Sequence, residues 1–243
     1  MLLKAKVIDI KPNGISLDLM PDQSRFTYSS SVSRNREPLA SLILYHAFKW
    51  SVVSPVFHTY LRGRIYGVEQ VPKEGPLVVV SNHASDFDPP IVSNCVGRPV
   101  AFMAKEELFR VPLLKQGIQL YGAYPVKRGA ADRSAIRSAL DYLSAGWAVG
   151  IFLSGTRTND GRIPDPKLGA ALIAAKAKAP LLPVSLWGTQ AVFQQGSPLP
   201  RPVPVTVRIG QLIEAPTSSK REELEALTQH CTAAIHNLHD LGR

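Results

Sequence analysis

The apolar run Leu77 to Val80 stands directly before the polar loop Ser-Asn-His-Ala-Ser-Asp-Phe-Asp and a pair of prolines. A short apolar run that stops at polar and turn-forming residues is typical of a buried strand. In open α/β sheets, ligands and catalytic groups gather at the carboxyl ends of such strands. This feature therefore predicts an α/β sheet with a polar site at the end of a buried strand.

Strand-like runs alternate with helix-like runs through the chain after Gly63. The expected strands cover residues 64–66, 77–81, 100–104, 121–126, 148–153, 181–186 and 203–209. The expected helices cover residues 89–96, 111–119, 132–144, 168–179 and 219–238, the last opened by a capping box of Ser219 and Glu222. This alternation predicts an α/β fold in which a mixed, largely parallel sheet is flanked by helices.

Two segments precede this α/β domain, which is expected to span 63–243. Residues 1–37 alternate only weakly between apolar and polar side chains, and we expect a loosely ordered extension there. Residues 38–62 are strongly apolar, and Pro55 interrupts them. A membrane span needs about 20 apolar residues, so this segment fits a membrane-associated, interfacial helix better, with a long buried core helix as the alternative. Three aromatic residues are expected to anchor it at the interface: Tyr45, Trp50 and Tyr60.

The charge balance favours an anionic partner, because the net charge is +9 and the pI is about 9.7. An acidic membrane surface, an acidic carrier protein and nucleic acid would all suit that charge. No nucleic-acid motif is recognisable, so we expect no nucleic-acid partner. Cys95 and Cys231 have no metal-ligand spacing and are expected to be free thiols in a reducing compartment. No secretory signal is recognised.

His83 and Asp88 lie on the same short loop, with four residues between them. An aspartate that folds back onto one ring nitrogen fixes the tautomer of a histidine and stabilises its charged form. The other ring nitrogen is then a competent general base. A capped turn without chemistry is the alternative for this pair considered alone.

Three further blocks fall where strands are expected to end. Residues 121–129 carry Lys127 and Arg128 beside a glycine, and residues 152–157 carry Gly155, Thr156 and Arg157. Residues 182–189 supply a buried strand with a polar exit. Arginine at a strand end suits bidentate capture of a phosphate, and lysine adds a point charge.

The order of these four blocks resembles the glycerolipid acyltransferase family, most closely the 1-acyl-sn-glycerol-3-phosphate (lysophosphatidate) acyltransferases. The family's His-x4-Asp block is matched by Asn82-His83 through Asp88, and its Gly-apolar-basic block by residues 122–128. Its Phe-Pro-Glu-Gly-Thr-Arg block is matched by residues 152–157, and its Val-Pro-Val block by residues 182–184. The stretch 104–108 is also similar to a recurrent family segment. The resemblance covers about residues 63–210 and makes 63–243 an expected acyltransferase domain.

One departure from the family pattern stands in the third block, where Leu153 and Ser154 replace the family's proline and glutamate. The change at Ser154 removes a carboxylate from beside the arginine that would bind phosphate. This puts in doubt either the rate or the identity of the acceptor. Ser154 is not expected to be a nucleophile, since no Gly-x-Ser-x-Gly elbow surrounds it.

The resemblance implies transfer of a fatty acyl group from a thioester donor, acyl carrier protein or coenzyme A, to the sn-2 hydroxyl of lysophosphatidate. The product would be phosphatidate for phospholipid biosynthesis. His83 and Asp88 would be catalytic, and no metal or cofactor is implied. The substrate-binding residues would be Lys105, Lys127, Arg128, Ser154, Gly155, Thr156 and Arg157. The expected location is the cytoplasmic face of a membrane. Another acceptor, such as glycerol 3-phosphate or a different lysolipid, and a catalytically impaired membrane-binding member are the alternatives.

Overall fold

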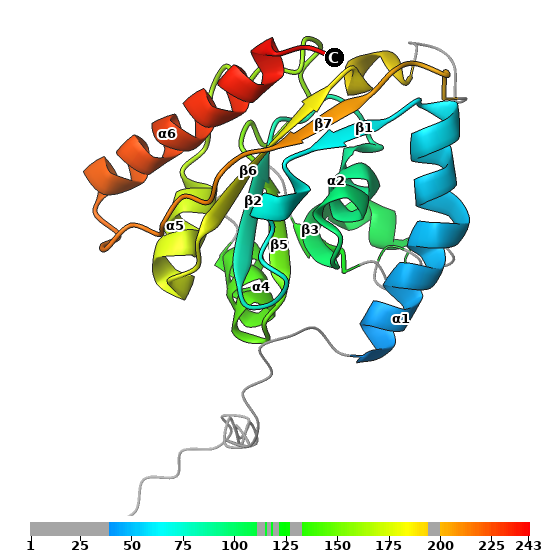
Figure 1. Ribbon diagram of the computed structural model, residues 1–243. Helices are drawn as coiled ribbons and strands as arrows, with labels where there is room; N and C mark the ends of the chain where they lie inside the picture. The colour runs from blue at the N-terminus through cyan, green and yellow to red at the C-terminus, as the bar shows by residue number, and fades with distance from the viewer. Residues whose placement is uncertain (1–38, 111–114, 116–117, 119–121, 127–132, 194–199) are drawn as a thin grey trace, which may run out of the picture. The chain divides into compact units, whose positions relative to one another are not determined.

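Seven strands form one sheet in the order β1-β7-β6-β2-β5-β3-β4. The structure is a computed structural model that describes residues 39–110, 115, 118, 122–126, 133–193 and 200–243 (Figure 1). The strands are β1 (Arg64–Tyr66), β2 (Leu77–Ser81), β3 (Val100–Lys105), β4 (Tyr124–Val126), β5 (Ala148–Phe152), β6 (Leu181–Trp187) and β7 (Thr206–Ile209). Among the pairings of these seven strands, the one between β6 and β7 alone is antiparallel, so β2 to β6 run one way while β1 and β7 run the other. The predicted mixed, largely parallel sheet is confirmed.

Helices connect and cover these strands. The longer ones are α2 (Asp88–Val96), α4 (Arg133–Ser144), α5 (Gly169–Ala177) and α6 (Arg221–Asp240). Short stretches of 3-10 helix lie at η3 (Val68–Gln70), η4 (Glu106–Arg110) and η5 (Thr189–Ala191). The extension expected at 1–37 lies outside the described residues, and so does the helix expected at 111–119 except for residues 115 and 118.

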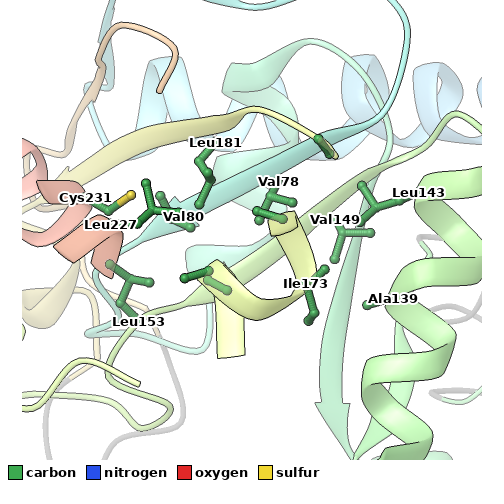
Figure 2. Close-up of a cluster of buried hydrophobic side chains, with 14 of the residues drawn as sticks. Val78, Val80, Ala139, Leu143, Val149, Leu153, Ile173, Leu181, Leu227 and Cys231 are labelled. Atoms are coloured by element: carbon green, nitrogen blue, oxygen red, sulfur yellow. The ribbon is translucent and has the colours of Figure 1, made fainter. Parts of the chain in front are cut away.

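The two faces of the sheet bury two separate apolar clusters, and β2 contributes to both. Val78 and Val80 point to the face covered by α4, α5 and α6, which Figure 2 shows in close-up. Leu77 and Val79 point to the face covered by α2 and the N-terminal helical segment. All five residues of β2 are buried, as expected for a parallel strand covered on both sides. The end of β2 is therefore held rigidly within the domain.

The apolar N-terminal segment is helical from residue 39 to residue 60, as predicted. It comprises α1 (Leu39–Phe48) and two π-helical stretches, η1 (Lys49–Val53) and η2 (Val56–Tyr60), which flank Pro55. A proline inside a helix removes one backbone donor and crowds the carbonyl four residues earlier. The wider i→i+5 spacing of a π-helix relieves this crowding, so the helix passes the proline without ending. The amides of Ser54 and Leu61 accordingly bond the carbonyls of Lys49 and Val56.

One side of this helical segment is buried and the other is exposed. Tyr45 and Phe57 are 2% and 1% exposed, and the Tyr45 hydroxyl donates to the Ser93 carbonyl of α2. Tyr45 is therefore a core contact, and its expected role as an interface anchor is wrong. Trp50 and Tyr60 remain 66% and 41% exposed. None of the helices in the described part of the chain has the length and apolar character needed to cross a membrane.

The start of α6 differs from the prediction, whereas the two cysteines agree with it. The helix begins at Arg221, and Glu223 accepts hydrogen bonds from the amide and hydroxyl of Ser218. The N-cap residue is Lys220, whose side chain makes no capping hydrogen bond, so the expected capping box of Ser219 and Glu222 is wrong. The helix begins two residues later than predicted, and the contact before it joins Ser218 to Glu223 instead. Cys95 and Cys231 are free and buried, and burial raises the pKa of each thiol to about 12.

Candidate active site

Three of the four sequence blocks meet at one edge of the sheet. β2, β5 and β6 are neighbours that run in the same direction, so their carboxyl ends lie together. The last residue of β2, Ser81, pairs with Phe152 of β5 on one side and with Val184 of β6 on the other. The His83 loop, the Gly155 loop and the end of β6 are therefore adjacent, as the rule for open α/β sheets predicts.

His83 and Asp88 form a buried hydrogen-bonded pair in this site. Asp88 Oδ2 lies 2.8 Å from His83 Nδ1 and accepts the amides of Ala84 and Ser85 at 2.7 and 2.8 Å. A carboxylate only accepts hydrogen bonds, so Nδ1 carries the proton in the neutral ring. Asp88 is the first residue of α2, where a negative charge is favoured by the helix dipole. The predicted contact between the two residues is present.

The His83 ring is also fixed by packing. It stacks on the Phe152 ring with 3.9 Å between centroids and 11° between planes, and Phe152 stacks in turn on Phe102. His83 is 6% exposed. No hydrogen bond within the described residues occupies Nε2. The ring therefore presents Nε2 as the nitrogen that can take a proton from a bound hydroxyl.

Asn82 is a supporting residue whose role the sequence analysis did not foresee. Its side-chain nitrogen donates to the carbonyls of Gly161 and Leu186, both at 2.8 Å, and its oxygen accepts the Leu186 amide at 2.8 Å. It is fully buried. A polar residue directly after a buried strand was the available signal, but its partners are distant in sequence.

The third block forms a tight turn after β5. The Ser154 hydroxyl donates to the Thr156 carbonyl at 2.6 Å, so it closes this turn and is 7% exposed. Gly155 has a φ of +69°, a left-handed conformation that favours glycine. Thr156 and Arg157 follow as exposed residues. The block thus presents Arg157 to solvent at the edge that carries His83.

Arg157 contacts the His83 loop directly. Its guanidinium lies 2.5 Å from Asp86 Oδ2, and the two side chains are 50% and 72% exposed. An exposed ion pair of this kind contributes only about 0–1 kcal/mol to stability. A phosphate that offers stronger charge-assisted hydrogen bonds can replace Asp86 at the guanidinium. Asp86 is a second residue that the sequence analysis missed, since nothing local marks it as a partner of Arg157.

The other predicted binding residues are only partly described. Lys105 is the last residue of β3, and its backbone pairs with Val126 of β4. Both strands end at the edge that carries His83, because they run parallel to β5. Lys127 and Arg128, which follow β4, lie outside the described residues. The expected role of these three cations stays a prediction.

An apolar cavity of about 450 Å³ lies beside the site. Phe87 and Pro90, which lie one residue before and two residues after Asp88, line one side of it, and the N-terminal helical segment lines the other. Phe87 also packs on Phe193, with 5.2 Å between ring centroids. Volumes of roughly 300–1,000 Å³ with mostly apolar walls are typical of small-molecule sites. The remaining lining residues are Phe48, Val52, Val53, Val56, Phe57, Tyr60, Leu61, Ile91 and Pro200.

Comparison with known proteins gives one consistent result. Residues 62–187 match the model of a family described as Acyltransferase. The chain is 33% identical to the 1-acyl-sn-glycerol-3-phosphate acyltransferase of Bacillus subtilis, over 56% of this chain and 70% of that protein. It is 30% identical to the chloroplastic protein of the same name from Brassica napus, over 61% of this chain. The chain covers only 43% of that plant protein's length.

A solved structure gives the same result for the fold. The crystal structure of the 1-acyl-sn-glycerophosphate (LPA) acyltransferase from Thermotoga maritima superposes with a TM-score of 0.63 and 28% sequence identity. The match covers 79% of this chain and 82% of the Thermotoga chain. This chain therefore shares the fold of the Thermotoga protein.

Proposed function

Because this chain belongs to the acyltransferase family, we propose that it transfers a fatty acyl group from an acyl thioester to the sn-2 hydroxyl of lysophosphatidate, giving phosphatidate. The observation that carries the proposal is the His83–Asp88 pair, with 2.8 Å between Nδ1 and Oδ2, beside a cavity of about 450 Å³. The names of the relatives support lysophosphatidate as the acceptor. Acyl carrier protein and coenzyme A both remain candidate donors.

The proposed reaction needs no covalent enzyme intermediate. His83 Nε2 takes the proton of the sn-2 hydroxyl while the hydroxyl oxygen attacks the thioester carbonyl carbon. Asp88 stabilises the imidazolium that forms. The tetrahedral intermediate then expels the thiolate, which receives that proton from Nε2, so the new ester and a free thiol leave. The apolar cavity beside Asp88 receives the acyl chain in this proposal.

The alternatives are the same chemistry on another acceptor and a member that binds membranes but turns over poorly. Ser154 is the observation that favours them, because it stands where the family has glutamate. Its hydroxyl carries no negative charge, and it already donates a hydrogen bond to the Thr156 carbonyl within its own turn. The substitution Ser154→Glu restores that carboxylate. Higher acyltransferase activity in this variant would mean that Ser154 impairs the site, and lower activity would mean that Ser154 suits a different acceptor.

The experiment that tests the function is phosphatidate formation by the purified protein. Lysophosphatidate is supplied with a long-chain acyl thioester or with an acetyl thioester, and His83→Ala serves as the blank. Product that depends on His83 and on the long chain supports the proposal. Product from Ser154→Glu but not from wild type identifies an impaired site. If wild type and Ser154→Glu both give no product with lysophosphatidate but do give product with another lysolipid, that lysolipid becomes the proposed acceptor.

Arg157 is proposed to bind the acceptor's phosphate. Arg157→Ala is expected to raise KM for lysophosphatidate by about tenfold or more, with a smaller change in kcat, because a charge-assisted hydrogen bond is lost. Asp86→Asn is the matched control, since it breaks the same ion pair but removes a carboxylate instead. Its KM is expected to fall two- to threefold, by about the small worth of an exposed charge pair. An unchanged KM in Arg157→Ala would place the phosphate elsewhere.

We also propose that the protein works at the cytoplasmic face of a membrane, held by the exposed side of the N-terminal helical segment. Ile43 and Trp50 on that side are 60% and 66% exposed. Replacing both by serine is expected to weaken binding to phosphatidylcholine–phosphatidylglycerol vesicles by about tenfold or more, as measured by co-flotation. The matched control is the pair Val68→Ser and Leu241→Ser, which are also exposed apolar residues. Equal loss in both pairs would contradict the proposal.

A further inference from the structure

The C-terminal end of α6 is joined to the loop 158–163, which follows the third sequence block. His236 Nε2 accepts the Ile163 amide at 3.1 Å, and Arg162 forms an ion pair with Asp240. The His239 ring is 7% exposed, and its Nδ1 lies 3.4 Å from the Ser185 hydroxyl of β6. Figure 1 shows this end of α6 beside the loops at the carboxyl edge of the sheet. These contacts of His236, His239 and Asp240 are called the α6 anchor below.

The loop 158–163 in turn supports the catalytic histidine. The Thr158 amide donates to the His83 carbonyl at 2.8 Å, and the Thr158 hydroxyl donates to the Arg162 carbonyl at 2.8 Å. Asn82, the residue before His83, donates to the Gly161 carbonyl.

Gly161 shows how closely the loop is packed. A Cβ added there would lie 3.0 Å from His239 Cε1 and 3.3 Å from Asn82 Nδ2. A continuous set of contacts therefore leads from α6 through the loop to His83.

The anchor requires an uncharged His236, because only an unprotonated ring nitrogen can accept the Ile163 amide. Burial, and then the nearby Arg162, lower the pKa of both His236 and His239. The negative charge of Asp240 raises the pKa of both rings, and that of Asp160 raises the pKa of His236, but neither outweighs the lowering. The two imidazoles are thus kept neutral to a lower pH than an ordinary histidine. As pH falls further, protonation of His236 removes the acceptor and releases the Ile163 amide.

We propose that His236 and His239 are positioning residues for the proposed acyl transfer: their neutral rings hold the loop 158–163 against Asn82 and so fix His83. His236 acts through the backbone of Ile163, and His239 acts through packing on Gly161. This inference rests on the proposed function for its kinetic consequences only, because the contacts themselves have a direct structural readout.

The test compares His236→Leu with His236→Gln in the full chain. Glutamine can offer an oxygen to the Ile163 amide and does not titrate, whereas leucine offers no acceptor. Hydrogen exchange is measured on peptides covering residues 82–88 and 158–163 at pH 7.5, with kcat and KM for lysophosphatidate measured in parallel between pH 5 and 8.

The leucine variant is expected to exchange about tenfold faster in both peptides and to lose about tenfold in kcat, with KM within twofold of wild type. The glutamine variant is expected to match wild type at pH 7.5. Below pH 6 its kcat should fall less steeply than that of wild type, because one fewer group must stay unprotonated.

Wild-type exchange in both peptides of the leucine variant would overturn the inference, and so would equal losses of kcat in the two variants. If wild type transfers no acyl group, the proposed function fails. The hydrogen-exchange comparison alone then decides whether the α6 anchor holds the loop 158–163 against the His83 loop. If thermal unfolding shows that the leucine variant does not fold, exchange in the same peptides is compared between wild type and His236→Gln at pH 5 and pH 7.5. Faster exchange in wild type than in the glutamine variant at pH 5 alone supports the inference, and equal exchange at both pH values overturns it.

Discussion

Replacing His83 by alanine is expected to lower kcat for phosphatidate formation by about 100-fold or more. A positioned general base contributes about 10²–10⁴-fold to a rate, and Nε2 of His83 is the nitrogen left available by the bond from Nδ1 to Asp88. KM for lysophosphatidate should change little, since the proposed phosphate contact lies at Arg157. Steady-state assays with lysophosphatidate varied at saturating acyl thioester measure both constants.

The control for this variant must separate chemistry from folding, because the His83 ring stacks on Phe152. His83→Gln keeps a polar side chain of similar length but cannot act as a base near neutral pH. Both variants should fall to the same low kcat, whereas the thermal midpoint of the glutamine variant should stay closer to wild type than that of the alanine variant. A glutamine variant with wild-type kcat would show that the histidine does not carry the proton.

The sheet could be predicted from local patterns because each strand is a short apolar run that ends at polar residues. β1 and β2 have the predicted bounds, and the other strands begin or end within three residues of them. The His83–Asp88 contact was also predictable, since one turn of chain joins the two residues. Such features depend on neighbours in the sequence, and a sequence pattern reports those directly.

Contacts between distant segments were not predictable in the same way. Asp86 meets Arg157, and Asn82 meets Gly161 and Leu186, only because β5 and β6 lie on either side of β2. Sequence order does not reveal strand order without further information, so these partners could not be assigned. The π-helical passage around Pro55 was missed for a different reason, because a proline in an apolar run also fits a break.

Replacing Asp88 by asparagine is expected to lower kcat by about 100-fold or more while leaving the fold largely intact. Asp88 Oδ2 accepts from Nδ1 of His83 and from two backbone amides, and an asparagine oxygen in that place can accept the same three bonds. The amide nitrogen then occupies the position of Oδ1, which is buried and makes no hydrogen bond within the described residues. What is lost is the negative charge that stabilises the imidazolium formed during proton transfer. The same aspartate-to-asparagine change in a serine-protease triad lowers kcat by about 10⁴-fold.

The comparison with Asp88→Ala separates charge from geometry. Alanine also leaves the buried amide of Ser85 and its neighbour without an acceptor, which costs about 1–3 kcal/mol for each unsatisfied group. Its thermal midpoint should therefore fall clearly below that of the asparagine variant, although both variants lose activity. If the asparagine variant kept wild-type kcat, Asp88 would serve only to shape the loop, and the imidazolium would need another stabilising group. If both variants were inactive and equally destabilised, kcat could not separate the loss of the charge from the loss of the loop geometry. Asp88→Glu would then decide, because a wild-type pH–rate profile in that variant would assign the charge a catalytic role.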